Sequence, residues 1–542
     1  MGEREKQVLQ TAAVIGKTFS EPLLTRVLGG VSEKALRQAL STLIASEFLF
    51  EAALYPEVQY SFKHPLTQEV AARSQLHDRR ARVHAAVAQA LEEAGGNLDE
   101  RAADIAQHWA EAGDRGRAAR WHRRAAEWAG LSDPREGLRH WRRVRELAPG
   151  MLDERERSEL ALQACFQLLS FGWRMGGTEE EAAIVYEEGR ALAERLGDRR
   201  ALAMLVGLYG LVRVMVAGSA HDYVRYGVEA ALLAEDGDAA LRAAVGTFPA
   251  FGHYYSGKGQ PALEWAARVL EATGSDNALG KDLTGYGPRV GMAFVRSIAL
   301  CRLGHFKEAW RVLEEGERVA EEMCEREVSL WLKVVRSLLS DACGLSQSTL
   351  EHGRRGFDMG EKLGSGHSRV VAHFCLGVAS MLAGQPAEAR ELLSKGAAIS
   401  QDGLAALGEL PQVLCYLSRA QLALGERTEA LTAAREGIEL GNAGGCYYFE
   451  AQAQLALAAA LMAADGEVPR TEIEAALARA EHLVDAIEGR SLSPQILEQR
   501  GRLAAACGDA TDATRLLHEA LDLYRTMGAA GHAERLTKEL GK

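Results

Sequence analysis

The sequence predicts a mainly α-helical protein whose chain is a tandem array of repeats. A glycine recurs about every 41 positions, and a second small residue follows most of these glycines twelve positions later. Self-similarity at such a period is typical of a solenoid, in which each unit buries its apolar face against its neighbours. The recurring glycines are Gly177, Gly218, Gly257, Gly304, Gly344, Gly384, Gly425, Gly466 and Gly508.

Each repeat is expected to be a helical hairpin. The helical stretches 292–303 and 307–322, for example, flank Gly304. Glycine suits this turn because a helix commonly ends on a left-handed residue, a conformation that costs a residue with a β-carbon roughly 1 kcal/mol. A small residue five positions after the glycine lets the second helix approach the first. These small residues are Ala182, Ala262, Ala309, Ala389, Ala430 and Ala513.

The first hundred residues have a different pattern. They predict three helices, the third capped by Ser32, and then two alternating strands around the turn Tyr55-Pro56-Glu57. The helices span 5–14, 20–28 and 32–46, and the strands 48–51 and 58–62. Three helices followed by a strand hairpin is the order of a winged-helix domain. A long helix from about Pro65 should then lead into the repeats. We therefore expect a winged helix over 1–75, connecting helices and first hairpins over 76–150, and repeats over 151–542.

Composition and charge narrow the classes of function. The 542 residues carry a formal charge of -12, which argues against a dominant nucleic-acid role, since phosphate binding needs clustered Lys and Arg. Eight scattered cysteines without a C-x-x-C pair indicate reduced thiols of a cytoplasmic protein. The longest apolar stretch, 201–216, contains Arg213, so no membrane segment is expected.

The repeats resemble the tetratricopeptide repeat. The residues that carry this resemblance are Leu376, Gly377, Gly384, Ala389 and Leu393, and again Leu417, Gly425 and Ala430. Tetratricopeptide units have about 34 residues, so these are longer-helix relatives of that repeat, of the kind found in regulatory proteins. The resemblance implies a binding protein with a concave groove.

The N-terminal region resembles large bacterial signalling proteins. The matching runs are EKQVLQTAAVIGKTF at 5–19, YSFKHPLTQEVA at 60–71 and RRARVH at 79–84. The family comprises multidomain class III adenylate or guanylate cyclases, with related kinases and transcription regulators, that carry an AAA-like signalling ATPase before a winged helix and helical repeats. The resemblance covers only their C-terminal part, so the cyclase and ATPase domains are expected upstream of Met1.

Two short motifs near the N-terminus point to nucleotides. Gly16-Lys17-Thr18 imitates a phosphate-binding loop, but Thr11 stands where the first glycine is required and the preceding segment is helical in pattern. In the signalling ATPases a winged-helix histidine contacts the β-phosphate of ADP, and Lys63-His64-Pro65-Leu66 resembles its context without the usual aspartate. An imidazole can donate a hydrogen bond to phosphate near neutral pH. The alternative is that His64 caps or packs at a strand-to-helix junction.

Other patterns give weaker indications. Ten arginines and three tryptophans, Trp121, Trp128 and Trp141, alternate over 115–145. This pattern can mark nucleic-acid binding, but the helical spacing favours core tryptophans with an outer arginine face that docks an upstream domain. No zinc-type His or Cys spacing and no nucleophile elbow occur. We therefore expect neither a metal, nor a cofactor, nor enzymatic activity in this chain.

The first helix of each hairpin should line the groove at positions 13, 10, 6 and 3 before the turn glycine. The aromatic and arginine residues at these positions are candidate partner contacts; they are Tyr254, Phe294, Trp331, Phe374, Arg419 and Arg502. The alternative is that Phe294 and Phe374 belong to the core between repeats. The first hypothesis is a regulatory region that senses a protein or small ligand and controls an attached or partner ATPase or cyclase. The others are a DNA-binding regulator that reads the groove with 32–46, and a free-standing scaffold.

Overall fold

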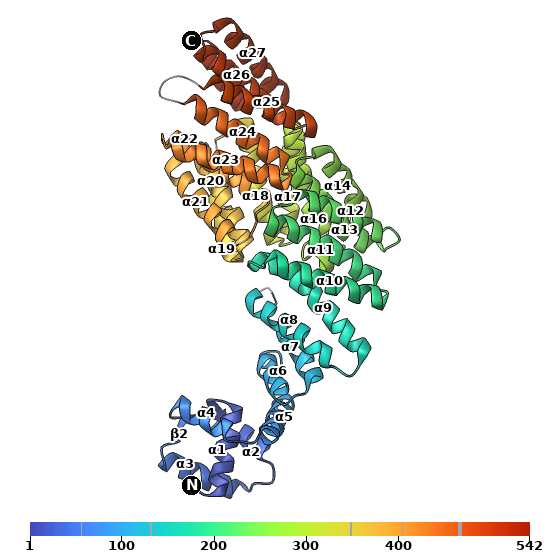
Figure 1. The fold of residues 1–542 in the computed structure, drawn as a ribbon, viewed down its shortest axis with the longest axis vertical. Helices are drawn as coiled ribbons and strands as arrows, with labels where there is room; N and C mark the ends of the chain where they lie inside the picture. Colours follow the sequence, from blue (N-terminus) through green and yellow to red (C-terminus); the bar gives the residue numbers. More distant parts are fainter. Residues whose placement is uncertain (56, 131–132, 347–348, 404, 464–468, 542) are drawn as a thin grey trace. The chain divides into compact units, whose positions relative to one another are not determined.

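The computed structural model describes residues 1–55, 57–130, 133–346, 349–403, 405–463 and 469–541. Within these residues the chain forms 28 α-helices and one three-stranded sheet, so the expectation of a mainly α-helical protein is confirmed. The chain divides into two compact units, Met1–Leu168 and Leu169–Lys542, called unit 1 and unit 2 below (Figure 1). The boundaries expected after residues 75 and 150 fall within unit 1 and remain predictions.

Unit 1 begins with three helices and a small sheet, arranged as expected for a winged helix. The sheet has the antiparallel order β1-β3-β2 and packs with the helices around one apolar core. The elements are α1 (Glu3–Ile15), β1 (Thr18–Ser20), α2 (Glu21–Leu28), α3 (Glu33–Ala45), β2 (Leu49–Ala53) and β3 (Gln59–Phe62).

Local signals explain which of these elements could be predicted. The Ser32 hydroxyl caps α3 by accepting a hydrogen bond from Ala35 N at 3.4 Å. Strand β1 was missed because three residues are too few for an alternating pattern. Pro56, in the turn expected between β2 and β3, lies outside the described residues.

The long helix expected from Pro65 is two helices, α4 (Pro65–Arg73) and α5 (His77–Glu93). The break is held by side chains of the intervening turn. Gln10 of α1 donates to the Ser74 hydroxyl at 2.8 Å, and Gln75 Nε2 donates to the Gln10 carbonyl at 3.0 Å. These long-range bonds stabilise the end of α4, and nothing in the local spacing announces them.

Four further helices complete unit 1, and two histidine pairs join α5 with α6 and α7 with α8. His84 Nδ1 of α5 lies 2.9 Å from His108 Nδ1 of α6, and His122 Nδ1 of α7 lies 2.8 Å from His140 Nδ1 of α8. One ring of each pair must donate and the other accept, so each pair needs at least one neutral ring. The helices are α6 (Ala102–Glu111), α7 (Arg115–Ala129), α8 (Pro134–Leu147) and α9 (Glu154–Gly172), whose last residues belong to unit 2.

Unit 1 is expected to lose stability in mild acid. Burial, His140 and nearby arginines lower the pKa of His122 to about 3. This folded-state pKa lies below the ordinary value of 6.5. The contribution of neutral His122 to the free energy of unfolding is therefore complete above pH 6.5 and is lost as the pH falls towards 3. Between pH 6.5 and 5 the loss from His122 should be about 2 kcal/mol.

Urea unfolding of the full chain at pH 7 and pH 5, followed by tryptophan fluorescence, measures this loss. His122→Leu should show a smaller loss between the two pH values than the wild type. His77→Leu is the matched control, because His77 is 83% exposed. Equal losses in wild type and His122→Leu would contradict the assignment.

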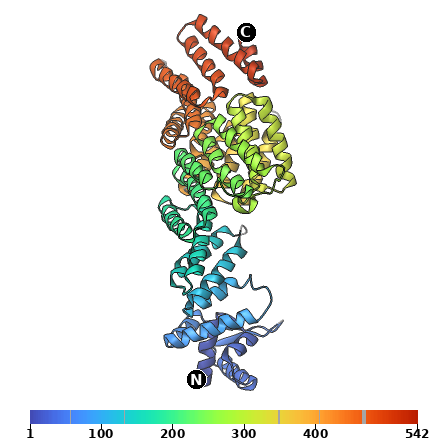
Figure 2. The same cartoon turned by 90° about the vertical axis from the view of Figure 1, so that its right-hand side faces the viewer.

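Unit 2 is a stack of helical hairpins, running from green to red in Figure 2. Consecutive helices pair as α11 with α12, α13 with α14, α16 with α17, and so on to α26 with α27. The helices are α10 (Glu179–Leu196), α11 (Arg199–Ala217), α12 (Ala220–Leu233), α13 (Ala239–Ser256), α14 (Gly259–Thr273), α15 (Lys281–Thr284), α16 (Pro288–Arg302), α17 (Phe306–Glu322), α18 (Arg326–Cys343), α19 (Thr349–Leu363), α20 (Gly366–Leu382), α21 (Pro386–Gly403), α22 (Leu410–Ala423), α23 (Arg427–Gly444), α24 (Tyr447–Met462), α25 (Arg470–Ile487), α26 (Ser493–Ala506), α27 (Ala510–Met527) and α28 (Ala530–Leu540).

The recurring glycines end the first helix of each hairpin in the left-handed conformation, with φ between 69° and 86° from Gly218 to Gly508. Two positions differ from the expectation. Gly176, with φ 81°, takes this role in place of Gly177, and Gly466 lies outside the described residues. The alanines five positions after the glycine are buried, except for the half-buried Ala182.

The stack of hairpins in unit 2 also coils back on itself, so that early hairpins contact late ones. A β-carbon added at Gly257 would lie 2.9 Å from Tyr448 N, and one added at Gly344 would lie 2.6 Å from His532 N. A third contact between an early and a late hairpin is the 2.9 Å hydrogen bond that Leu407 N donates to Met215 O. We call this line of contacts the seam; its early side consists of Gly218, Gly257, Gly304 and Gly344. Glycine at these positions permits close approach as well as the turn.

Helix α11 is the one described helix that is long and apolar enough to cross a membrane, and 67% of its most apolar window is buried inside the protein. Its Arg213 lies on the side of α12, where Arg213 Nη2 contacts Asp222 Oδ2 at 2.9 Å. The helix packs against α10 and α12. Most of its apolar side chains are therefore buried in the core of the stack.

Candidate functional site

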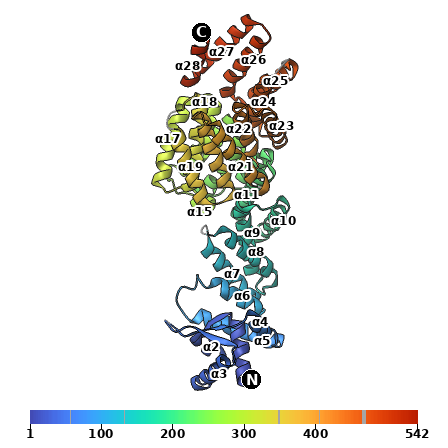
Figure 3. The same ribbon diagram turned by 90° about the vertical axis from the view of Figure 1, so that its left-hand side faces the viewer.

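A cavity of about 340 Å³ lies among the later hairpins of unit 2. Two of the residues selected by the repeat register, Arg419 of α22 and Arg502 of α26, line it together. In Figure 3, α18 lies next to α22, and α26 to α28 stand at the C-terminal end of the stack. The lining residues are Asp341, Cys415, Arg419, Gln452, Leu455, Ala456, Ala459, Gln495, Glu498, Gln499, Arg502, Tyr524, His532 and Arg535.

One side of the cavity is built on Asp341. Both terminal nitrogens of Arg419 donate to its carboxylate at 2.9 Å, and the Tyr416 hydroxyl donates to Oδ2 at 2.7 Å. Burial alone would raise the pKa of Asp341, but Arg419 and Tyr416 hold it below its ordinary value. Asp341 is therefore ionised near neutral pH, and Arg419 is fixed in direction by a bidentate pair.

The other side is built on Glu498. Arg535 Nη2 donates to Oε2 at 2.7 Å, Arg502 Nη2 to Oε1 at 2.5 Å, and the Tyr524 hydroxyl to Oε2 at 3.0 Å. Burial opposes ionisation here too, but the two arginines hold the pKa of Glu498 below its ordinary value. This carboxylate joins α26 to α28 in the lining of the cavity.

The sequence reasoning missed Asp341, Glu498 and Arg535, and two of them had a readable signal. Asp341 stands three positions before Gly344, and Glu498 stands ten positions before Gly508. Both positions belong to the register that selected Arg419 and Arg502, but only aromatic and arginine residues were considered there. Arg535 and His532 lie on α28, beyond the last hairpin, where that register does not apply.

The aromatic candidates have a different environment. Tyr254, Phe294 and Phe374 are buried, and Trp331 is half-buried. The Phe294 ring lies 5.0 Å from Tyr254 and 6.1 Å from Trp331 between centroids, and Phe374 packs on Tyr416 at 5.4 Å. Tyr254 is in addition approached across the seam by Phe449 of α24, at 6.2 Å. For Phe294 and Phe374, this burial favours the alternative that they belong to the core between repeats.

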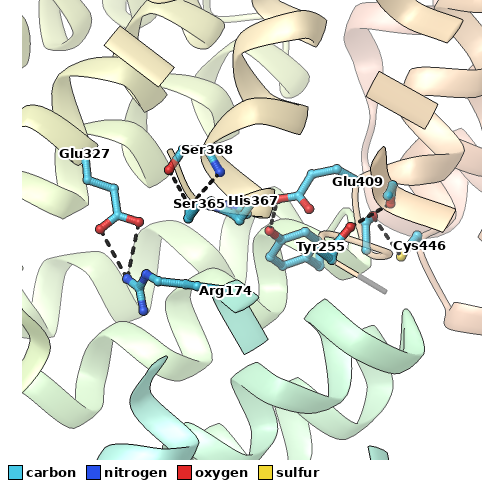
Figure 4. Close-up of polar contacts among 11 residues, drawn as sticks. Arg174, Tyr255, Glu327, Ser365, His367, Ser368, Glu409 and Cys446 are labelled. Atoms are coloured by element: carbon cyan, nitrogen blue, oxygen red, sulfur yellow. Dashed lines mark hydrogen bonds and ion pairs between the residues drawn. The ribbon is translucent and has the colours of Figure 1, made fainter. Parts of the chain in front are cut away.

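A polar cluster in the interior of unit 2 was not predicted either (Figure 4). The Tyr255 hydroxyl donates to Glu409, His367 Nε2 lies 3.7 Å from Glu409 Oε1, and Arg174 pairs with Glu327 at 3.2 Å. The Tyr255–Glu409 and Arg174–Glu327 contacts join residues 154 and 153 positions apart in the sequence, so local spacing gives no sign of them. They fix early hairpins against late ones.

In unit 1, His64 lies at the N-cap of α4, and its side chain is exposed and makes no capping hydrogen bond. The expected capping role is therefore not seen, and the imidazole faces solvent. Lys17 follows a helix and precedes strand β1, the reverse of the order in a phosphate-binding loop. That geometry gives Lys17 no cradle for phosphate.

The basic segments of unit 1 are largely neutralised by carboxylates. Arg120 pairs with Glu156 and Arg124 with Asp99, each at 2.5 Å, and Arg139 pairs with Glu136. Trp141 is buried and Trp121 half-buried, but Trp128 is 53% exposed, which corrects the expectation that all three are core. The reason is that the buried face of α7 consists of Ala118, Ala119, His122, Ala125 and Ala126, and Trp128 lies outside that face.

On the expected groove-reading helix α3, Arg37 contacts Glu21 at 3.3 Å and Glu33 on its own helix. Lys34 is the other basic residue of this helix. Two basic residues are few for the phosphate contacts that position a protein on DNA. The structure thus adds nothing in favour of DNA binding by α3.

Comparisons with known proteins complete the description. No protein-family model and no curated protein matches the sequence. Among solved structures, a Rap protein complexed with competence and sporulation factor is similar, with 10% identity, a TM-score of 0.49, and coverage of 69% of this chain and 99% of that chain.

Two other solved structures are similar at the same low level of identity. A signal transduction ATPase with numerous domains and a tetratricopeptide repeat sensor, from Pyrococcus horikoshii, has 11% identity, a TM-score of 0.32, and coverage of 100% and 66%. Aspartyl phosphate phosphatase F from Bacillus subtilis has 10% identity, a TM-score of 0.38, and coverage of 70% and 97%. The assignment of tetratricopeptide-like hairpins rests on the helices of this chain itself.

Proposed function

We propose that this chain is a non-catalytic regulatory region that binds a protein or small ligand in its helical repeats and controls a signalling ATPase or cyclase. The observation that carries the proposal is the cavity at Arg419 and Arg502, two residues that the repeat register selects as groove positions. Its volume of about 340 Å³ is within the range of small-molecule sites. The free cysteines suit the cytoplasm as its place of action.

The winged helix is the proposed relay between the repeats and the ATPase. This step rests on the resemblance of Lys63-His64-Pro65-Leu66 to the ADP-sensing segment of signalling ATPases, and on the exposure of His64. An exposed imidazole that makes no capping bond is free to contact a phosphate supplied by another domain.

Replacing His64 should release ADP from the assembled system. The chain is produced together with its signalling ATPase, and the ADP retained after purification is measured by chromatography of the denatured complex. His64→Ala should lower the retained ADP about tenfold, the value of one hydrogen bond to a charged group. His77→Ala is the control, since His77 is 83% exposed elsewhere in unit 1. Unchanged ADP in His64→Ala would reject the role of His64.

Physical association tests the regulatory role as a whole. Co-expression of the tagged chain with a signalling ATPase from the same genome should give a stable complex and a changed ATP hydrolysis rate. A complex that forms without a change of rate would indicate a scaffold. A gel shift at 50 mM salt that disappears at 200 mM salt, without any ATPase complex, would instead support a nucleic-acid role.

A further inference from the structure

The charge that the cavity presents to a ligand is positive. The side chains of Arg419, Arg502 and Arg535 are 37%, 48% and 41% exposed, whereas those of Asp341 and Glu498 are only 13% and 8% exposed. These two carboxylates are therefore more covered than the guanidinium groups that they hold in place. Three guanidinium groups against two carboxylates leave the lining with an excess of positive charge, and Glu539, which pairs with Arg502 and Arg535, is not part of the lining.

The three arginines keep hydrogen-bond donors for a ligand. Glu498 is bound by Nη2 of Arg502 and by Nη2 of Arg535, and Arg535 Nη1 also donates to Glu539 Oε2 at 3.4 Å. Each guanidinium has five N–H groups in a fixed plane, so these contacts leave N–H groups of both arginines for a ligand. Such a planar fork matches the oxygens of a carboxylate or a phosphate. The geometry suits an oxoanion rather than a cation or a neutral apolar molecule.

The remaining lining would hold the body of the ligand. Gln452, Gln495 and Gln499 contribute amide groups, which both donate and accept hydrogen bonds. Gln499 Nε2 donates to Leu455 O at 3.1 Å, while its Oε1 is buried and has no partner among the described residues. A buried acceptor without a partner is costly, so a donor on the ligand would stabilise it. Tyr524 and His532 are the ring side chains of the lining; the two rings stack on each other at 4.9 Å between centroids, and the Tyr524 hydroxyl binds Glu498.

We propose that this cavity is the binding site for a small organic oxoanion, a metabolite with carboxylate or phosphate groups and a polar, non-aromatic body. Arg502 and Arg535 bind the acid group, Arg419 binds a second acid group or balances its charge, and the glutamines bind the polar body. This inference rests on the proposed sensing function and names the chemical class of its ligand.

The position of the cavity links binding to the seam. His532 Nε2 of α28 donates to Asp341 O of α18 at 2.8 Å, beside the close approach of Gly344. Arg419 is paired with Asp341 of α18, on the early side, and Arg535 lies with His532 on α28, on the late side. A ligand held by Arg419 and Arg535 would therefore link the two sides of the seam. Binding should slow hydrogen exchange in α28 and raise the melting temperature of unit 2.

Isothermal titration calorimetry of the full chain with citrate and with pyrophosphate tests the proposal, in a buffer without phosphate and at matched ionic strength. Arg502→Gln should weaken binding of the probe about tenfold or more, because a charge-assisted hydrogen bond is lost. This variant should fold, since Glu498 keeps Arg535 and Tyr524. Arg515→Gln on α27 is the control, because Arg515 is 55% exposed, lies outside the lining and changes the net charge equally.

Each outcome decides something. Binding of citrate alone assigns carboxylates, and binding of pyrophosphate alone assigns phosphates. Absence of binding by both probes, or equal weakening in Arg502→Gln and Arg515→Gln, overturns the proposal. An ATPase complex with a changed rate, found together with no anion binding, would leave the regulatory function standing and remove only this ligand class.

Discussion

Replacing Glu317 by alanine should lower the free energy of unfolding by about 3–5 kcal/mol, because two covered cations would lose their shared carboxylate. Lys333 Nζ lies 2.9 Å and Arg336 Nε 3.1 Å from Glu317 Oε1. The three side chains are only 15%, 17% and 18% exposed, so water cannot replace the lost partner easily. The triad fastens α17, the second helix of one hairpin, to α18, the first helix of the next.

The control is Glu322→Ala on the same helix. Glu322 pairs with Arg318 at 2.6 Å, but these side chains are 58% and 61% exposed. An exposed pair contributes about 0–1 kcal/mol. Chemical denaturation of both variants should therefore separate them clearly, and a cost below about 1 kcal/mol for Glu317→Ala would contradict the account of the triad.

The Glu317 triad also has a pH dependence of known sign. Burial opposes ionisation, but Arg336 and Lys333 hold the pKa of Glu317 below its ordinary value of 4.5. A carboxyl with a lowered folded-state pKa contributes stability above 4.5, and the contribution is lost as the pH falls through the folded-state value. Glu317→Gln, which keeps the size but not the charge, should abolish this part of the acid loss.

Local spacing predicted the hairpins because each hairpin is made by residues close in sequence. A glycine such as Gly304, with φ 86°, marks the end of one helix, and a buried alanine such as Ala309 marks the start of the next. The errors arise where such a local pattern is too short or is overridden by a distant residue. Strand β1 has too few residues for a pattern, and the turn at Ser74 depends on Gln10, which lies 64 positions away.

The cavity could be predicted in part for the same reason. Arg419 and Arg502 were found because both stand six positions before a turn glycine, and the same register contains Asp341 and Glu498. The burial of Tyr254 could not be foreseen, because it depends on the approach of Phe449, 195 positions later, along the seam. The pitch and coiling of the stack arise from the sum of small rotations between successive repeats, and the sequence of a single repeat does not predict that sum.

Alanine in place of Gly344 should destabilise the protein by about 1–3 kcal/mol more than alanine in place of Gly384. The two glycines occupy equivalent turns and have nearly equal φ, 70° and 73°, so the cost of the left-handed conformation is the same in both variants. They differ in their surroundings. A β-carbon at Gly344 would lie 2.6 Å from His532 N across the seam, whereas one at Gly384 would have no atom within 4 Å.

The difference between the two variants therefore measures the cost of disturbing the seam, without the cost of the left-handed turn. Chemical denaturation gives the difference in stability, and hydrogen exchange of α28 should become faster in Gly344→Ala but not in Gly384→Ala. If the seam instead opens freely in solution, both variants will lose the same stability and α28 will exchange alike in both. In that case the hairpins alone would determine the stability of unit 2, and the proposed coupling between the anion cavity and the seam would have no structural basis.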